Sequence, residues 1–191
     1  MKIVQAAVFV IALFVSQTPE ISFAEVAPSP ACVIFRVDMA DRDAKNPKLN
    51  GAKIDWPAVR ARDAERRINM QKLLDGGAVN NSKDYYCAAV VFQHGDNEED
   101  IQLAHALAVV SAKLNPHLKN TRYMVAATWD RYMVMRKRPQ WYGTQYVRGN
   151  DNRWVLHPVD ESAVDDDARR KLAVPTLAEA RAEVAQLNSK P

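Results

Sequence analysis

The residues best suited to chemistry lie in residues 129–146, WDRYMVMRKRPQWYGTQY. Asp130 and Arg131 form an adjacent acid and base in a run that otherwise has the pattern of an apolar helix. Neighbouring residues on a helix point about 100° apart, so these two side chains are poorly placed to pair with each other. Each therefore needs a partner of its own, because a charge on a core-facing stripe is costly when it is unpaired.

The Asp130–Arg131 pair has two interpretations. In the structural one, Arg131 reaches a carboxylate or the carbonyls of the segment that follows, and Asp130 holds the amides of residues 140–145. In the functional one, Arg131 faces a cleft and binds an anion through its forked guanidinium group. The sequence leaves both open.

The segment after Pro139 is the densest in hydrogen-bonding groups. Two amides, a phenol and a hydroxyl surround a glycine that lets a ligand approach the backbone, and such groups orient polar ligands in binding sites. The residues are Gln140, Tyr142, Gly143, Thr144 and Gln145. The alternative, which composition favours, is a hairpin strand whose side chains are packed and solvated by turns.

Gln93 and His94 end a predicted helix, residues 83–94, that is apolar nearly all round and is therefore expected to be buried. A histidine at a buried helix end commonly has a shifted pKa, which makes His94 a candidate general base. His105 could meet His94 if two helices pair across the turn between them. The sequence contains no H-E-x-x-H, C-x-x-C, P-loop or G-x-S-x-G motif, so we expect no metal, no cofactor and no identifiable nucleophile.

Helical segments must position these residues. Apolar periodicity and capping residues predict helices over residues 56–74, 83–94, 98–114, 121–136, 160–172 and 176–187. Aromatic and β-branched runs at 142–147 and 153–157 flank a Gly/Asn/Asp turn and predict a β-hairpin. Residues 33–37 fit a strand or the start of a helix. The expected fold is mainly α, an orthogonal or antiparallel helical domain with one C-terminal β-hairpin, and α+β is the alternative.

The N-terminus has the pattern of a signal peptide, residues 1–24. Lys2 is followed by an apolar run of 13 residues, and Ser22 and Ala24 are the small residues expected before a cleavage site. The run is shorter than the ~20 helical residues that span a bilayer, so an uncleaved anchor is the lesser alternative. Residues 25–31 are predicted to be an extended tether, and residues 32–191 a single globular domain, periplasmic or secreted, without membrane association after cleavage.

Cysteine content and charge narrow the setting further. The chain beyond residue 24 has two cysteines, Cys32 and Cys87, and in an exported protein such a pair predicts one disulfide. Two buried free thiols are the alternative, because pairing requires a specific geometry. The formal net charge of +3 is too mild for a nucleic-acid or polyanion partner.

Several motifs together resemble a bacterial domain-of-unknown-function family with the pattern QH…DR…PQxYGTQ. The resemblance covers residues 60–179 and includes Asp84, Gln93-His94, Asp130-Arg131, Pro139-Gln140, Tyr142-Gly143-Thr144-Gln145, Arg169-Arg170 and Pro175. That family has no established activity. The resemblance implies that these positions belong together, without indicating a reaction.

Two functional hypotheses follow, beside a purely structural one in which every polar group satisfies another. The first is a protein that binds an unknown small polar or anionic molecule, or a protein, in a cleft formed by the helix ends at 94 and 131 and the hairpin. Its expected ligand-binding residues are Gln93, Arg131, Gln140, Tyr142, Thr144, Gln145, Arg169 and Arg170. The second is a small hydrolase or transferase with His94 or Asp130 as general base.

Overall fold

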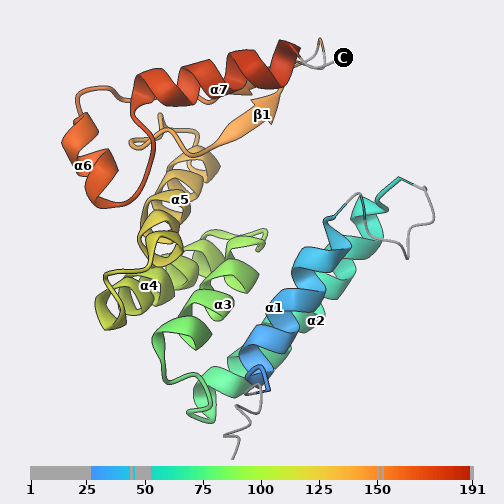
Figure 1. Ribbon diagram of the computed structural model, residues 1–191. Helices are drawn as coiled ribbons and strands as arrows, with labels where there is room; N and C mark the ends of the chain where they lie inside the picture. Colours follow the sequence, from blue (N-terminus) through green and yellow to red (C-terminus); the bar gives the residue numbers. More distant parts are fainter. Residues whose placement is uncertain (1–26, 44, 46–52, 150, 152, 190–191) are drawn as a thin grey trace, which may run out of the picture.

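The computed structural model describes residues 27–43, 45, 53–149, 151 and 153–189. The predicted signal peptide lies outside these residues. Over the described residues the chain is 63% helical, with seven helices and one two-stranded antiparallel hairpin near the C-terminus (Figure 1). This confirms the prediction of a mainly α fold with a C-terminal hairpin.

The N-terminal arm consists of two helices that lie side by side, α1 (Pro30–Asp41) and α2 (Trp56–Asp75) (Figure 1). The hydroxyl of Ser29 accepts a hydrogen bond from the amide of Cys32, and a proline occupies the first turn, as at many helix starts. Helix α1 therefore includes residues 33–37, for which sequence left strand and helix open, and the last two residues of the expected tether. Asp55 caps α2, as predicted, by accepting from the amide of Ala58.

Three helices form the centre of the molecule: α3 (Ser82–Gln93), α4 (Glu98–Leu114) and α5 (Lys119–Met135). Helix α3 contacts α1, α2, α4 and α5, and seven of its 12 residues are buried. Helix α3 therefore lacks a polar face because it is buried, as the sequence predicted. Full burial of a side chain such as Val91 or Phe92 contributes about 1.5–3 kcal/mol, so this helix anchors the core.

The C-terminal arm contains the hairpin of β1 (Tyr146–Arg148) and β2 (Trp154–Leu156), followed by α6 (Asp166–Lys171) and α7 (Leu177–Ser189). The strands are shorter than expected, because residues 141–144 form a loop bound to Asp130 and not the first part of a strand. Helix α6 is also shorter than predicted. The predicted capping box opens α7, where the Thr176 amide donates to the Glu179 carboxylate at 2.7 Å.

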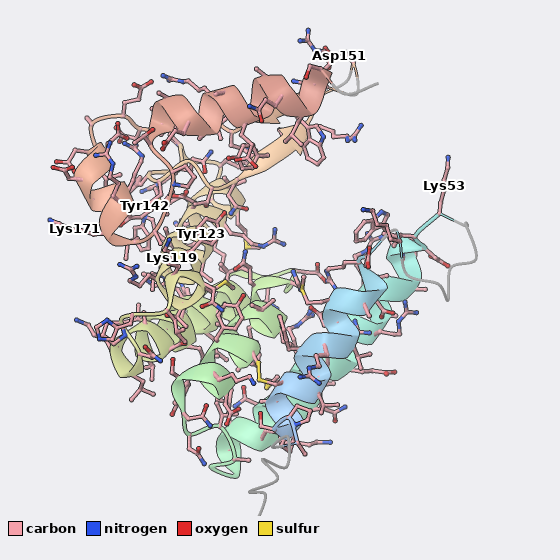
Figure 2. The ribbon with its side chains drawn as sticks, viewed as in Figure 1. Lys53, Lys119, Tyr123, Tyr142, Asp151 and Lys171 are labelled. Carbon is pink, nitrogen blue, oxygen red and sulfur yellow. A yellow bond between two sulfur atoms is a disulfide. The ribbon has the colours of Figure 1, made fainter. Side chains whose placement is uncertain are left out.

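A disulfide between Cys32 and Cys87 joins α1 to α3, which confirms the predicted pair and excludes the two free thiols (Figure 2). Among the described residues, none of the helices combines the length and the apolar character needed to cross a membrane.

Candidate functional site

Asp130 organises the loop between α5 and β1 from inside the protein. Its side chain is 0% exposed, and its carboxylate accepts four hydrogen bonds. One oxygen accepts from the amides of Trp141 and Tyr142, at 2.8 and 3.0 Å, and the other from the amide and hydroxyl of Thr144, at 3.0 and 2.8 Å. A carboxylate offers about four lone-pair sites, so all are in use. We therefore do not retain Asp130 as a general base: it has the structural role of holding the loop amides.

Two other expected ligand-binding residues also support this loop. Gln140, fully buried, donates to the carbonyls of Gln145 and His157 and accepts from the Gln145 amide at 2.8 Å. Arg169 is 3% exposed and donates to the carbonyls of Trp141 and Tyr142, at 2.9 and 3.2 Å. The polar groups of both side chains are hydrogen-bonded within the protein, so neither residue is placed to bind a ligand.

Arg170 and Tyr142 lie away from the other candidates. Arg170 is exposed and pairs with Asp167 at 3.0 Å. Tyr142 lies beside α6, on the side of α5 away from α1 (Figure 2). Burial, and to a lesser degree the negative charge of Asp130, raises the pKa of its phenol. Neither residue contributes to the cleft described next.

A cavity of about 460 Å³ opens between the N-terminal arm and the loop-hairpin segment, within the ~300–1,000 Å³ typical of ligand sites. Its polar lining brings together four residues predicted from sequence: Gln93, His94, Thr144 and Gln145. Aromatic side chains from five elements (α1, α3, α5, β1 and β2) form most of the remaining wall: Phe35, Tyr86, Tyr123, Tyr146 and Trp154. Sequence reasoning missed this aromatic wall because its members are far apart in the chain.

Arg131 lines an adjoining cavity of about 220 Å³, which shares Gln145 and Tyr146 with the first. We call the two cavities together the cleft. Arg131 makes no ion pair or side-chain hydrogen bond with any residue that the structure describes, and its Nε is buried without a partner. Burial lowers the pKa of the Arg131 guanidinium, the charge of Asp96 opposes that shift, and the charge of Arg42 adds to it. The structural interpretation required a hydrogen bond from Arg131 to a carboxylate or a carbonyl, and none is formed within the described ranges of the chain.

Two amide side chains leave acceptors at the cleft. The Oε1 atom of Gln93 is buried and has no hydrogen-bond donor among the described residues. The Gln145 amide nitrogen donates to the Ala127 carbonyl and the Thr144 hydroxyl, both at 3.1 Å. Its nitrogen is therefore fixed by the protein, and its oxygen is the atom left for a ligand.

His94 is held by a carboxylate from α1. Its Nδ1 lies 2.7 Å from Oδ2 of Asp38, which is 1% exposed. Asp38 also pairs with Arg42 at 2.7 Å and with Arg66 at 3.4 Å, within a cluster of acids and arginines between α1 and α2. With Nδ1 engaged, Nε2 is the nitrogen free for proton transfer, the arrangement that carboxylates impose on catalytic histidines. In the sequence, the spacing of Asp38 and Arg42 by one helical turn was the signal that could have indicated this ion-paired carboxylate.

His105 does not meet His94. Its Nδ1 lies 3.0 Å from the hydroxyl of Thr128, and the ring lines a different cavity between α4 and α5. In the described part of the chain, no group of three histidine, cysteine or acidic side chains is arranged to hold a metal ion.

No protein-family model, curated protein or solved structure compared with the chain matches it. The resemblance to the QH…DR…PQxYGTQ pattern therefore stays a prediction, and any function must be argued from the geometry of the cleft.

Proposed function

We propose that this chain is an exported protein, periplasmic or secreted, that binds a small anionic ligand in the cleft, with Arg131 as the principal contact. One observation carries the proposal: the half-buried Arg131 guanidinium faces a cavity without a partner among the described residues. Removing a cation from water is costly unless it is paired, and a guanidinium matches carboxylates and phosphates in bidentate geometry.

The rest of the cleft supports a ligand with one acidic end and a polar body. The cavity beside Arg131 shares the lining residues Gln145 and Tyr146 with the larger aromatic-walled one. Acceptor oxygens of Gln93 and Gln145 would bind hydroxyl or amide donors of that body, while the aromatic rings would contact its apolar faces. The disulfide supports an extracytoplasmic setting, because such bonds persist in oxidising compartments.

The test compares acidic ligands with their neutral analogues. Sugar acids, dipeptides and muramyl peptides would be screened by thermal shift and measured by calorimetry, each beside its amide or neutral sugar. We expect Arg131→Gln to weaken binding of the acids by about ten- to a hundredfold, since a hydrogen bond to a charged group contributes about 1.5–3 kcal/mol. Arg131→Lys should fall between, because it keeps the charge and loses the fork.

Arg138→Gln is the matched control, because it removes an exposed arginine three residues beyond α5. It should bind as the wild type does. Equal affinity for acids and neutral analogues, or unchanged binding by Arg131→Gln, would contradict the proposal.

The contact between His94 and Asp38 favours a second candidate, a small hydrolase or transferase with His94 as general base. No nucleophile is assigned, so this ranks below ligand binding. Esters, amides and glycosides would be screened for turnover. If His94 is the general base of an enzyme, His94→Gln abolishes turnover and keeps ligand binding. Turnover that survives His94→Gln excludes this role.

A further inference from the structure

A second cavity, of about 340 Å³, opens between α4 and α5 and is lined by Gln102, His105, Trp129 and Tyr132. It lies on another face of α5 from the cleft. Ala127, which lines the cleft, and Trp129 are two residues apart, which on an α-helix places them about 200° from each other around the axis. The proposed function leaves this cavity without a role.

Aromatic rings form its wall. The Trp129 ring centroid lies 5.5 Å from that of His105 and 6.0 Å from that of Tyr132, both in tilted arrangements. Trp141, which is not part of the lining, packs against Trp129 with its centroid 4.8 Å away. Tilted rings around one indole make a concave apolar surface, which suits a ligand with a flat apolar face.

The Trp129 indole also carries a polar group that the protein does not satisfy. Its Nε1 atom is buried and has no acceptor within the described ranges of the chain. An indole N–H can only donate, and a buried donor without an acceptor costs free energy. A ligand whose acceptor atom reaches this N–H as it stacks on the ring would satisfy it.

Hydrogen bonds determine what the other lining groups offer. The Thr128 hydroxyl donates to the Met124 carbonyl at 2.8 Å, so its oxygen accepts from Nδ1 of His105 at 3.0 Å, and Nε2 of that ring carries a lone pair. The Tyr132 hydroxyl oxygen accepts from Gln102 at 3.3 Å and from Arg136 at 3.0 Å, which leaves its O–H to donate. The cavity thus mixes donors and acceptors.

The lining carries no formal charge at neutral pH. Burial lowers the pKa of the His105 imidazole, although the Val125 carbonyl opposes the shift, and the ring is therefore neutral. Arg136, which contacts Tyr132, is paired with Glu98 at 3.1 Å. A charged ligand would find no counter-ion among these residues, so charge complementarity favours a neutral one.

We propose that this cavity is a second binding site, which takes a neutral saccharide unit stacked on Trp129. One face of a pyranose presents C–H groups to an aromatic wall, and its hydroxyls each donate and accept, which matches the mixed edge formed by Trp129, Tyr132, His105 and Gln102. An aromatic heterocycle has a fixed donor and acceptor pattern and fits that edge less well.

The test follows the indole N–H resonances of the full chain by ¹H–¹⁵N NMR. Glucose, galactose, N-acetylglucosamine and their short oligomers would be titrated, with glucuronate as the charged counterpart and indole as the aromatic one. We expect a neutral sugar to shift the Trp129 resonance saturably and to leave that of Trp56, exposed on α2, unchanged.

Three variants distinguish loss of sugar binding at this cavity from effects on the cleft and from loss of folding. Trp129→Phe keeps an aromatic ring and removes the N–H donor, so it should weaken sugar binding about tenfold. Binding to this variant would be measured by saturation-transfer NMR from the protein to the sugar. Gln102→Ala, at an exposed position, should also weaken sugar binding without affecting folding. Arg131→Gln should leave sugar binding unchanged, so the proposal for this cavity and the proposal for the cleft are tested independently. Tighter binding of glucuronate or indole than of every neutral sugar, or no shift of Trp129 with any sugar, would overturn the proposal.

Discussion

At the scale of single residues, Asp130 and Arg131 differ in what surrounds their charges. The Asp130 carboxylate is enclosed by amides and a hydroxyl of the loop that follows α5, and each of its oxygens accepts two hydrogen bonds. Arg131, one position further along, projects to the cleft and has no direct partner in the described chain. The first charge organises the loop, and the second is the one that a ligand would neutralise.

We predict that Asp130→Asn destabilises the fold by about 3 kcal/mol, because the asparagine NH₂ would face amide donors and leave buried N–H groups without acceptors. Urea denaturation of the purified variant would measure the loss. The same substitution at Asp167, which is exposed and paired with Arg170, should change stability little. Equal losses in the two variants would show that the Asp130 contacts do not organise the loop.

At the scale of elements, one face of α1 joins three features of the site. Cys32, Phe35 and Asp38 follow each other at intervals of three residues and therefore lie near one side of the helix. They supply the disulfide to α3, part of the aromatic wall, and the carboxylate that holds His94. The position of α1 on α3 thus decides the shape of the cleft.

The disulfide should contribute strongly to that position. It spans a sequence separation of 55, for which loop-closure entropy gives about 4 kcal/mol. We expect the double variant Cys32→Ala/Cys87→Ala to unfold at a lower urea concentration and to bind cleft ligands more weakly. The wild type under reducing conditions is the control and should behave like the variant. A reduced wild type that keeps its full stability would contradict the prediction.

At the scale of the whole molecule, the central helices separate the arm of α1 and α2 from the C-terminal arm (Figure 1). The larger cavity of the cleft is lined by residues of both arms. The arm of α1 and α2 is held together by acids and arginines, with Arg66 paired to Asp38, Asp41 and Asp63. Burial raises the pKa of Asp41 and of Asp63, but hydrogen bonds and charges from arginines outweigh it, so both pKa values lie below the ordinary value.

These shifts predict how stability depends on pH. A carboxyl group with a lowered folded pKa stabilises the fold above its unfolded pKa, about 4, and this stabilisation is lost as the pH falls through the folded value. Arg66→Gln would allow both pKa values to rise, so we expect acid unfolding, followed by circular dichroism, to begin at higher pH. Loss of a buried partner should also cost about 3 kcal/mol at neutral pH.

Arg181→Gln is the control for that experiment, since Arg181 and Glu161 form an exposed pair on the other arm. Its acid transition should match that of the wild type. If Arg66→Gln and Arg181→Gln unfolded at the same pH, the cluster between α1 and α2 would not determine acid stability.

Sequence patterns predicted the local structure well where the signal was local. Caps and apolar periodicity located α2, α3, α4, α5 and α7, each within a few residues of its observed bounds. The first strand was predicted too long because residues 142–145 have strand-like composition, while Asp130, a residue of α5, binds their amides and draws them into a loop. A contact from another element overrode the local preference there.

The sequence by itself indicated the helical architecture, a single candidate cysteine pair, and the requirement that Asp130 and Arg131 have separate partners, because these depend on periodicity, cysteine number and the geometry of one helix. Only the tertiary structure decided what those partners are. It satisfied Asp130 and left Arg131 at a cavity, and it brought Asp38 to His94 across 56 residues. Such contacts depend on how helices pack, which local pattern does not encode, and the proposed function rests on them.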